Sequence, residues 1–437
     1  MNWLNFFDTK TEKKHSFGRG TNANISPQEE EFFNKSMIAF EDKNILDAYE
    51  YFLSSLINFH GEDSNHNITI KREESTLYFE LLQGSAKVTG TITQELFEAE
   101  VILVKKLDAS VALKRYILER NYQLTYSHYF SDKKYIKLKV FHDNITMSPQ
   151  KIFFPIREIA LNADFDKEHI KSEFKNIELQ DIKHISKIDE NELKIKYQYL
   201  NLWIDELNSK VLTLPSNDNT GMQAFLYLNL LFQIDYLLVP KYDIYQKSNK
   251  KIQEYFGEEN SSIEAKNEEL KRFVEKLKSM SFKEFSANSY NAKYTFNPIE
   301  KTPYDDVVNF ISESLTKIRW YKNNRYTQII PVIYKYIAVY ALYNYGLNQV
   351  LRSLLHLLVE IQNSNFFKEL GYKIYYETHE ETFSKRQIIS KIEAIIKPHQ
   401  VKYQSLQAFG DELNFRSINE FSYSFYIQLK NLDFEEL

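Results

Sequence analysis

Hydrophobic positions change their spacing several times along the chain, and each change predicts a different kind of element. Ser26-Pro27-Gln28-Glu29 is typical of a helix start, with a capping box and proline at the first helical position. Apolar residues then recur at helical spacing over residues 32–40. After a polar break at 42–44, the same spacing continues over residues 45–57. The chain therefore begins, after a polar tail, with helical segments.

The spacing becomes alternating between Asn67 and Lys106, which predicts three or four antiparallel strands. Helical spacing returns from Asp108 to Arg120, and Tyr122–Phe130 and residues 135–140 then read as the two strands of a hairpin. Ser148-Pro149 starts a further helix. The predicted order is α–β(3–4)–α–ββ–α with an antiparallel sheet.

Strand patterns nearly vanish beyond Asp189, and the remaining chain carries helical spacing throughout. We therefore predict a flexible polar tail over residues 1–25, with Trp3, Phe6 and Phe7 near its start, and an α+β domain over 26–187. Residues 188–437 are expected to form an all-α domain of roughly eight to ten helices. The sequence has no internal period of 20–50 residues, so a repeat solenoid is not predicted.

The segment YILERNYQLTYSHYF (Tyr116–Phe130) marks one change from helical to alternating spacing. Strand alternation would place Tyr122, Leu124, Tyr126 and His128 together on one face of the sheet, and we expect that face to be the buried one. Tyr129 and Phe130 are then left as exposed aromatic candidates for contact with a partner.

The amino-acid composition favours a globular protein with long regular elements and argues against several kinds of site. The 437 residues hold 43% hydrophobic residues, enough for two or three cores, and only 10 Gly and 9 Pro, which favours long regular elements. A net charge of −5 gives no general basic surface of the kind that duplex-binding proteins carry. The absence of cysteine excludes disulfides and thiolate chemistry and fits a reducing compartment.

No membrane segment is predicted. The N-terminus lacks the apolar run of a signal peptide. The most apolar stretch, Ile329–Tyr343, contains Pro331 and Lys335 and is shorter than the roughly 18 residues that a span requires. We therefore expect a cytoplasmic protein without membrane contact.

Three segments of the N-terminal third carry a family resemblance: ALKRYILERNYQLTYSHYFSD (Ala112–Asp132), KYIKLKVF (Lys134–Phe141) and SPQKIFFPIREIALNAD (Ser148–Asp164). They resemble the helix-to-strand passage, the second hairpin strand and the closing helix of the YbjN-like family, within the type III secretion chaperone-like fold. The resemblance implies a non-enzymatic protein-binding module and supplies no catalytic residue. The C-terminal half resembles no family that we recognise.

Residues that could support catalysis do not form a known motif. His379-Glu380-Glu381 is followed by Phe383 where a zinc-binding HExxH motif needs histidine, and His356 lies in an apolar run typical of a core. No phosphate-binding loop, dinucleotide fingerprint or nucleophile elbow occurs. The sequence therefore predicts no catalytic residue, no metal site and no cofactor.

One short segment, KIRWYKNNRY, combines cations with aromatic rings, the composition used to bind single-stranded nucleic acid. Its candidate residues are Lys317, Arg319, Trp320, Tyr321, Lys322 and Arg325. The simpler interpretation is a helix end, where cations favour the dipole and the aromatics are half buried. Since the chain is acidic, we favour that interpretation and regard nucleic acid as the less favoured partner.

Three hypotheses follow. The first, which we favour, is a chaperone-like protein-interaction module joined to a helical scaffold, with an unidentified protein partner and self-association left open. The second is an enzyme whose site lies in the helical domain, around the loop 214–221, His356 and the basic cluster at 317–325. The third is single-stranded nucleic-acid binding through residues 317–326.

Overall fold

The computed structural model describes residues 17–18, 27–57, 67–144, 148–174, 176–215, 219–257, 261–292 and 300–435. Buried apolar side chains form two separate cores. One is built from residues between Ile45 and Leu179, and the other from residues between Leu193 and Leu432. The predicted α+β domain followed by a helical domain is therefore confirmed. Trp3, Phe6, Phe7 and the capping residue Ser26 lie outside the described residues.

The N-terminal domain is a single antiparallel sheet with four helices. The sheet has the strand order β1-β2-β3-β4-β6-β5. Its elements are α1 (Pro27–Glu41), α2 (Ile45–Ser55), β1 (Ile68–Glu73), β2 (Thr76–Gln83), β3 (Ala86–Ile92), β4 (Leu96–Lys105), α3 (Val111–Asn121), β5 (His128–Ser131), β6 (Tyr135–Asp143) and α4 (Pro149–Glu173).

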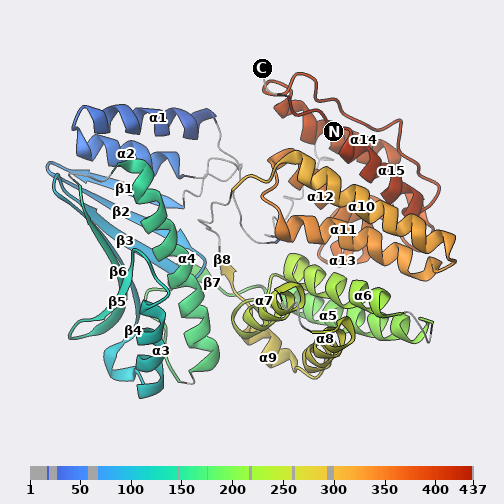
Figure 1. Cartoon of the computed structure of the whole chain (residues 1–437), viewed down its shortest axis with the longest axis horizontal. Helices are drawn as coiled ribbons and strands as arrows, with labels where there is room; N and C mark the ends of the chain where they lie inside the picture. Colours follow the sequence, from blue (N-terminus) through green and yellow to red (C-terminus); the bar gives the residue numbers. More distant parts are fainter. Residues whose placement is uncertain are drawn as a thin grey trace, which may run out of the picture.

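One face of the sheet is covered and the other is open. Helix α4 crosses β2, β3, β4 and β6, while α2 packs on β1 and β2 with α1 outside it. Figure 1 shows that α4 also lies between the sheet and the helical domain, so the open face of the sheet points away from that domain. Alternate residues of β2, β3 and β4 are buried beneath α4.

Gly90 lies inside β3 although glycine is a poor strand former, because no larger residue would fit there. It pairs with Phe79 of β2, and a Cβ atom added at Gly90 would lie 2.0 Å from the Phe79 ring. The ring thus occupies the space that any other side chain would need, and it stacks on Phe97 of β4 at 5.8 Å.

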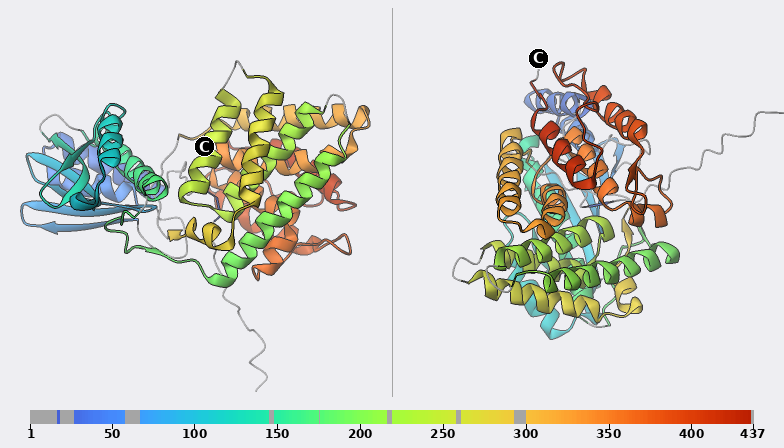
Figure 2. Two further views of the ribbon diagram at one scale, coloured as in Figure 1. Left: turned by 90° about the horizontal axis from the view of Figure 1, so that it is seen from below. Right: turned by 90° about the vertical axis from the view of Figure 1, so that its right-hand side faces the viewer.

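The helical domain is centred on α6 and α11, whose side chains are buried nearly all round. Helices that precede, separate and follow these two in the chain pack against the pair, and Figure 2 shows the helical domain from two further sides. The helices are α5 (Glu190–Leu212), α6 (Thr220–Gln233), α7 (Tyr242–Gly257), α8 (Ile263–Lys278), α9 (Phe282–Ala287), α10 (Tyr304–Asn323), α11 (Ile330–Asn344), α12 (Gln349–Gln362), α13 (Ser364–Glu369), α14 (Lys385–Ile396) and α15 (Ile418–Lys430). Two short pairs of strands are also present, β7 (Ile185–Ser186) with β8 (Asn291–Ala292) and β9 (Tyr376–Glu377) with β10 (Thr382–Phe383). No helix in the described part of the chain is both long and apolar enough to span a membrane.

The two domains meet along the C-terminal half of α4. Buried Glu168 accepts hydrogen bonds from the Tyr290 hydroxyl at 2.6 Å and from the Tyr242 backbone N–H at 3.3 Å. His169 pairs with Gln246 at 3.0 Å, and the Ser172 hydroxyl donates to a carboxylate oxygen of α7 at 3.0 Å. A helix of the α+β domain thus supplies most of the polar contacts to the helical domain.

Burial raises the pKa of Glu168 to about 7, with a further contribution from the negative charge of Asp164. The folded chain therefore binds one more proton than the unfolded chain between pH 4.5 and about 7. Stability from this group increases as pH falls through 7 and is complete below 4.5. Relative to Glu168→Gln, the wild-type protein should gain about 2 to 3 kcal/mol of unfolding free energy between pH 8 and pH 5.

Urea unfolding of both proteins at several pH values measures this difference. A wild-type-minus-variant difference that stays constant across the range would show that Glu168 titrates normally.

Candidate functional site

The last turns of α4 carry ionisable side chains that point toward different parts of the molecule. Asp164 accepts hydrogen bonds from the Ser85 N–H at 2.6 Å and from its hydroxyl at 2.8 Å, so it holds the β2–β3 turn. Lys167 is fully buried and donates to the carbonyl oxygens of Ser85 at 3.1 Å and Gln180 at 2.8 Å. Burial lowers the pKa of Lys167 to about 8.

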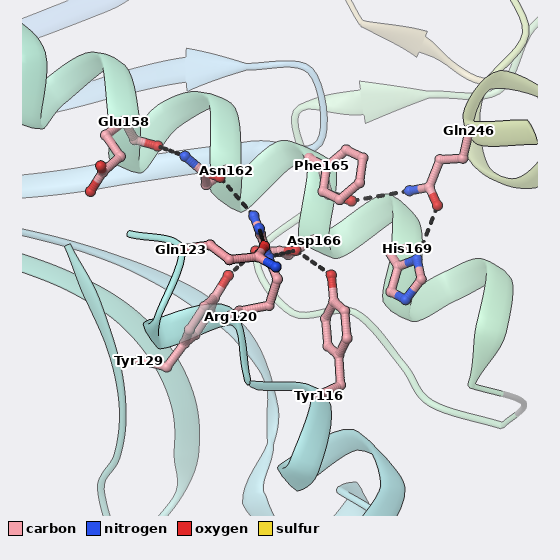
Figure 3. A network of polar contacts seen from close by, with 10 residues as sticks. All are labelled: Tyr116, Arg120, Gln123, Tyr129, Glu158, Asn162, Phe165, Asp166, His169 and Gln246. Carbon is pink, nitrogen blue, oxygen red and sulfur yellow. Dashed lines mark hydrogen bonds and ion pairs between the residues drawn. The ribbon is translucent and has the colours of Figure 1, made fainter. Parts of the chain in front are cut away.

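Asp166 lies at the centre of a buried polar network shown in Figure 3. One carboxylate oxygen accepts from the Tyr116 hydroxyl at 2.5 Å and from Arg120 Nε at 2.9 Å, and the other accepts from the Tyr129 hydroxyl. Arg120 also donates to the Asn162 side chain at 2.7 Å. These contacts join α3, β5 and α4 through one carboxylate.

The charges of the network support an anchoring role. The side chain of Asp166 is 1% exposed and that of Arg120 is 13% exposed. Burial disfavours the charged form of Arg120, but Asp166 outweighs this and the pKa of the guanidinium is raised. Burial and Asp166 together raise the pKa of Tyr116 and of Tyr129, so both phenols remain protonated donors. A carboxylate bonded to three donors holds α3 in place, and this geometry does not present a free acid or base to a substrate.

A second carboxylate of α4 explains why the segment after α3 is not a strand. Glu158 accepts hydrogen bonds from the backbone N–H groups of Thr125, Tyr126 and Ser127 at 2.7–2.8 Å. Burial works against the charged form, but these donors outweigh it and lower the pKa of Glu158. Because the side chain uses these N–H groups, they cannot join a strand ladder.

The prediction that Tyr122–Phe130 forms a strand with Tyr129 exposed is therefore wrong in two respects. The strand starts only at His128, and Tyr129 is buried with its hydroxyl on Asp166. Tyr122, expected in the core, is 93% exposed, and Tyr126 is also exposed. Six residues separate α3 and β5, and α4 holds three of them through Glu158, so alternation counted from Tyr122 does not apply.

Phe130 is half-buried on the open face of the sheet. The ammonium groups of Lys137 and Lys139 lie 5.7 and 5.9 Å from its ring centre. The same open face has a hollow of about 480 Å³, lined by residues of β1, β2, β3, β4 and β6. Many of the charges on this face are already paired, as between Lys139 and Glu98 at 2.8 Å and between Lys87 and Glu80 at 2.8 Å.

The outer face of α3 shows a feature that the sequence analysis missed. Val111, Leu118 and Tyr122 follow at intervals of seven and four residues, which places them in one line along the helix. All three are exposed, and so is Leu107, just before the helix. We name Leu107, Val111, Leu118 and Tyr122 the α3 stripe.

Residues 111–118 have helical spacing, but their apolar positions do not share one side of the helix. Leu113 and Ile117 face the core, whereas Val111 and Leu118 lie on the opposite side. A helical wheel would have shown apolar residues on both sides of α3. This signal was available in the sequence.

The basic-aromatic segment lies at the C-terminal end of α10, in the helical domain and far from α3 (Figure 1). Tyr321 is buried, as the simpler interpretation of that segment requires. Trp320 is 56% exposed, however, and the remaining candidates also face solvent; these are Lys317, Arg319, Lys322 and Arg325.

The three regions of the enzyme hypothesis do not converge. The first turn of α6, at the end of the 214–221 stretch, lies near the basic segment, since a Cβ at Gly221 would lie 3.4 Å from the Tyr321 hydroxyl. His356 instead pairs with the Tyr236 hydroxyl at 2.8 Å and packs beside Phe17 and Phe367. Within the described ranges, no group of three or more His, Cys, Asp or Glu side chains could hold a metal ion.

The chain was compared with models of protein families and with curated proteins. No protein-family model matches the chain, and no curated protein matches it either.

Removing the charge of Asp166 should loosen α3. In Asp166→Asn the buried Arg120 loses its counter-charge and two phenols lose a charged acceptor, so the free energy of unfolding should fall by about 3 kcal/mol. The control Asp205→Asn breaks a surface ion pair to Lys278 and should cost less than about 1 kcal/mol. Urea unfolding followed by circular dichroism compares the two, and equal costs would contradict the anchoring role.

Proposed function

We propose that this chain is a non-enzymatic, chaperone-like protein-binding module in which the α3 stripe contacts the partner and the helical domain serves as a scaffold. The observation that carries the proposal is the row of large apolar side chains facing solvent on one side of a helix. Leu107 is 95% exposed and Tyr122 is 93% exposed, so neither side chain gains from burial in the chain itself. Exposed apolar rows of this kind mark interaction surfaces.

The charges beside the stripe favour one kind of occupant. Lys105, Lys114 and Arg115 are exposed and form no ion pair with any described residue, and Arg115 lies in line between Val111 and Leu118. With Lys106, these cations outnumber the exposed acids of the same stretch, Asp108 and Glu119. An amphipathic helix of a partner protein, with apolar residues three or four apart and acidic residues beside them, would match both features. We therefore assign the stripe to an acidic amphipathic helix.

The Asp166 network supports this assignment because it fixes the helix that carries the stripe. Tyr116 and Arg120 point inward from α3 to Asp166, on the side opposite Leu118. A binding surface held by buried contacts loses little conformational freedom when it binds. The polar anchor inside and the apolar stripe outside are thus two sides of one short helix.

The resemblance to the YbjN-like family agrees with this proposal, since one of the three segments that carry it, Ala112–Asp132, includes most of α3. The open sheet face is a weaker candidate, because its lysines and glutamates already neutralise one another across strands. A cytoplasmic location fits the absence of cysteine and is part of the proposal.

The proposal predicts that Leu118→Glu and Tyr122→Glu lose the partner without losing stability. Both side chains face solvent, so the unfolding free energy should change by less than about 0.5 kcal/mol. Leu212→Glu is the matched control, since Leu212 is an exposed leucine at the end of α5. Affinity capture from cells that express the protein naturally, quantified by mass spectrometry, should show a protein retained by wild type and Leu212→Glu but lost by both α3 variants.

Two results would overturn it. Capture of the same proteins by wild type and Leu118→Glu would place binding elsewhere. Alternatively, light scattering could show a wild-type dimer that Leu118→Glu dissociates, which would make the stripe a contact between two copies of this chain.

A further inference from the structure

The end of α10 is a second exposed surface, independent of α3. It consists of Lys317, Arg319, Trp320, Lys322, Arg325 and Tyr326, which we name the α10 tip. Apart from half-buried Tyr326, these side chains are exposed.

The charge of this region departs from that of the chain. The chain carries 60 acidic residues and a net charge of −5, yet no Asp or Glu occurs from Ser314 to Val359. Glu313 lies one turn before Lys317 in α10, yet the four cations of the α10 tip form no ion pair with any residue that the structure describes. Exposed lysines of other helices do pair with acids one turn away, as Lys194 does with Glu190 at 2.7 Å and Lys247 with Asp243 at 2.5 Å. The α10 tip therefore keeps its positive charge available to an anion.

An aromatic platform lies among these cations. The indole of Trp320 stacks on the Tyr326 ring with centroids 6.2 Å apart and planes 30° apart. Buried Tyr321 packs edge-on against Trp320 at 5.1 Å and against Phe225 at 6.3 Å, which connects the platform to the core. Trp320 nevertheless remains 56% exposed, so part of its ring is free to stack on a flat ligand group.

Arg325 ends the helix in a backbone conformation that glycine adopts more easily. Its φ angle is 61°, in the left-handed region, and the following Tyr326 N–H donates to the Tyr321 carbonyl at 2.9 Å. A glycine would end the helix with less strain. Arginine at this position adds a cation beside Tyr326 that the fold itself does not require.

We propose that the α10 tip binds single-stranded nucleic acid, with an unpaired base stacked on Trp320 and the phosphates contacted by the four cations. An exposed indole surrounded by unpaired cations fits a chain of alternating bases and phosphates. A paired base in a duplex does not offer its face for such stacking. The acidic net charge of the chain argued against nucleic acid, but the exposed indole of Trp320 and four cations without an ion pair to any described residue favour it.

Fluorescence anisotropy with a labelled 15-nucleotide oligo-dT tests the proposal on the full chain. We expect a micromolar Kd at about 50 mM salt. Because each phosphate contact in a single strand contributes about −0.7 to the slope of log K against log salt, up to four contacts should give a slope between about −1.5 and −3. Binding should also quench the fluorescence of Trp320, and a duplex of the same length should bind more weakly.

Variants separate a binding role from a structural one. Trp320→Ala and Lys317→Gln/Lys322→Gln should each weaken binding at least fivefold. Arg325→Gly should raise the Tm while weakening binding about twofold to fivefold, whereas Arg325→Lys should retain binding close to that of wild type. The control Arg386→Gln/Lys391→Gln removes two exposed cations from α14 and should leave binding unchanged.

The proposal is overturned if oligo-dT does not bind at 50 mM salt, or if the α14 control weakens binding as much as Lys317→Gln/Lys322→Gln does. It is also overturned if Trp320→Ala binds like wild type and inorganic polyphosphate competes as well as the oligonucleotide, since this would show a general anion site. A loss of binding in Arg325→Gly accompanied by a lower Tm would indicate a damaged fold and count against the assigned role of Arg325.

Discussion

The buried carboxylate of Asp166 determines how the N-terminal domain is assembled around α3. A charge this deeply buried is tolerated only when donors surround it, and Tyr116, Arg120 and Tyr129 supply them from two other elements. Those donors occupy the inner side of α3, beside Leu113 and Ile117. The remaining apolar residues of this short helix then have no place except the outer side, where the α3 stripe faces solvent.

Helix α4 carries further polar side chains along its length that bond to other segments of the chain. Glu158 holds the segment after α3, Asp164 holds a β-turn, Lys167 satisfies carbonyl oxygens of two loops, and Glu168 bonds to the helical domain. The apolar side of α4 covers the sheet while these polar contacts fix what surrounds it. Loops and domains are therefore positioned by hydrogen bonds to side chains of one helix, in addition to hydrophobic burial.

Local patterns predicted the elements well and their surroundings poorly. Helical and alternating spacing identified the order of helices and strands, and Ser148-Pro149 correctly marked the start of α4, because these signals depend on near neighbours in the chain. The burial of Tyr129 and the irregular segment at 122–127 depend on Asp166 and Glu158, some 30 to 40 residues away. No spacing rule contains such a contact. The α3 stripe, by contrast, could have been found by plotting both sides of the helix.

The two proposed surfaces lie in different domains and use different chemistry, apolar contact on α3 and charge with stacking on α10. We propose that the α3 stripe binds an acidic amphipathic helix. Photo-crosslinking tests it most directly: a photoreactive amino acid replaces Leu118 in one protein and Leu212 in the other, and the crosslinked peptides are sequenced. We expect position 118 alone to crosslink to a single protein, at a segment with apolar residues three or four apart flanked by acids. Crosslinks from position 118 that match those from position 212, or that join two copies of this chain, would contradict it.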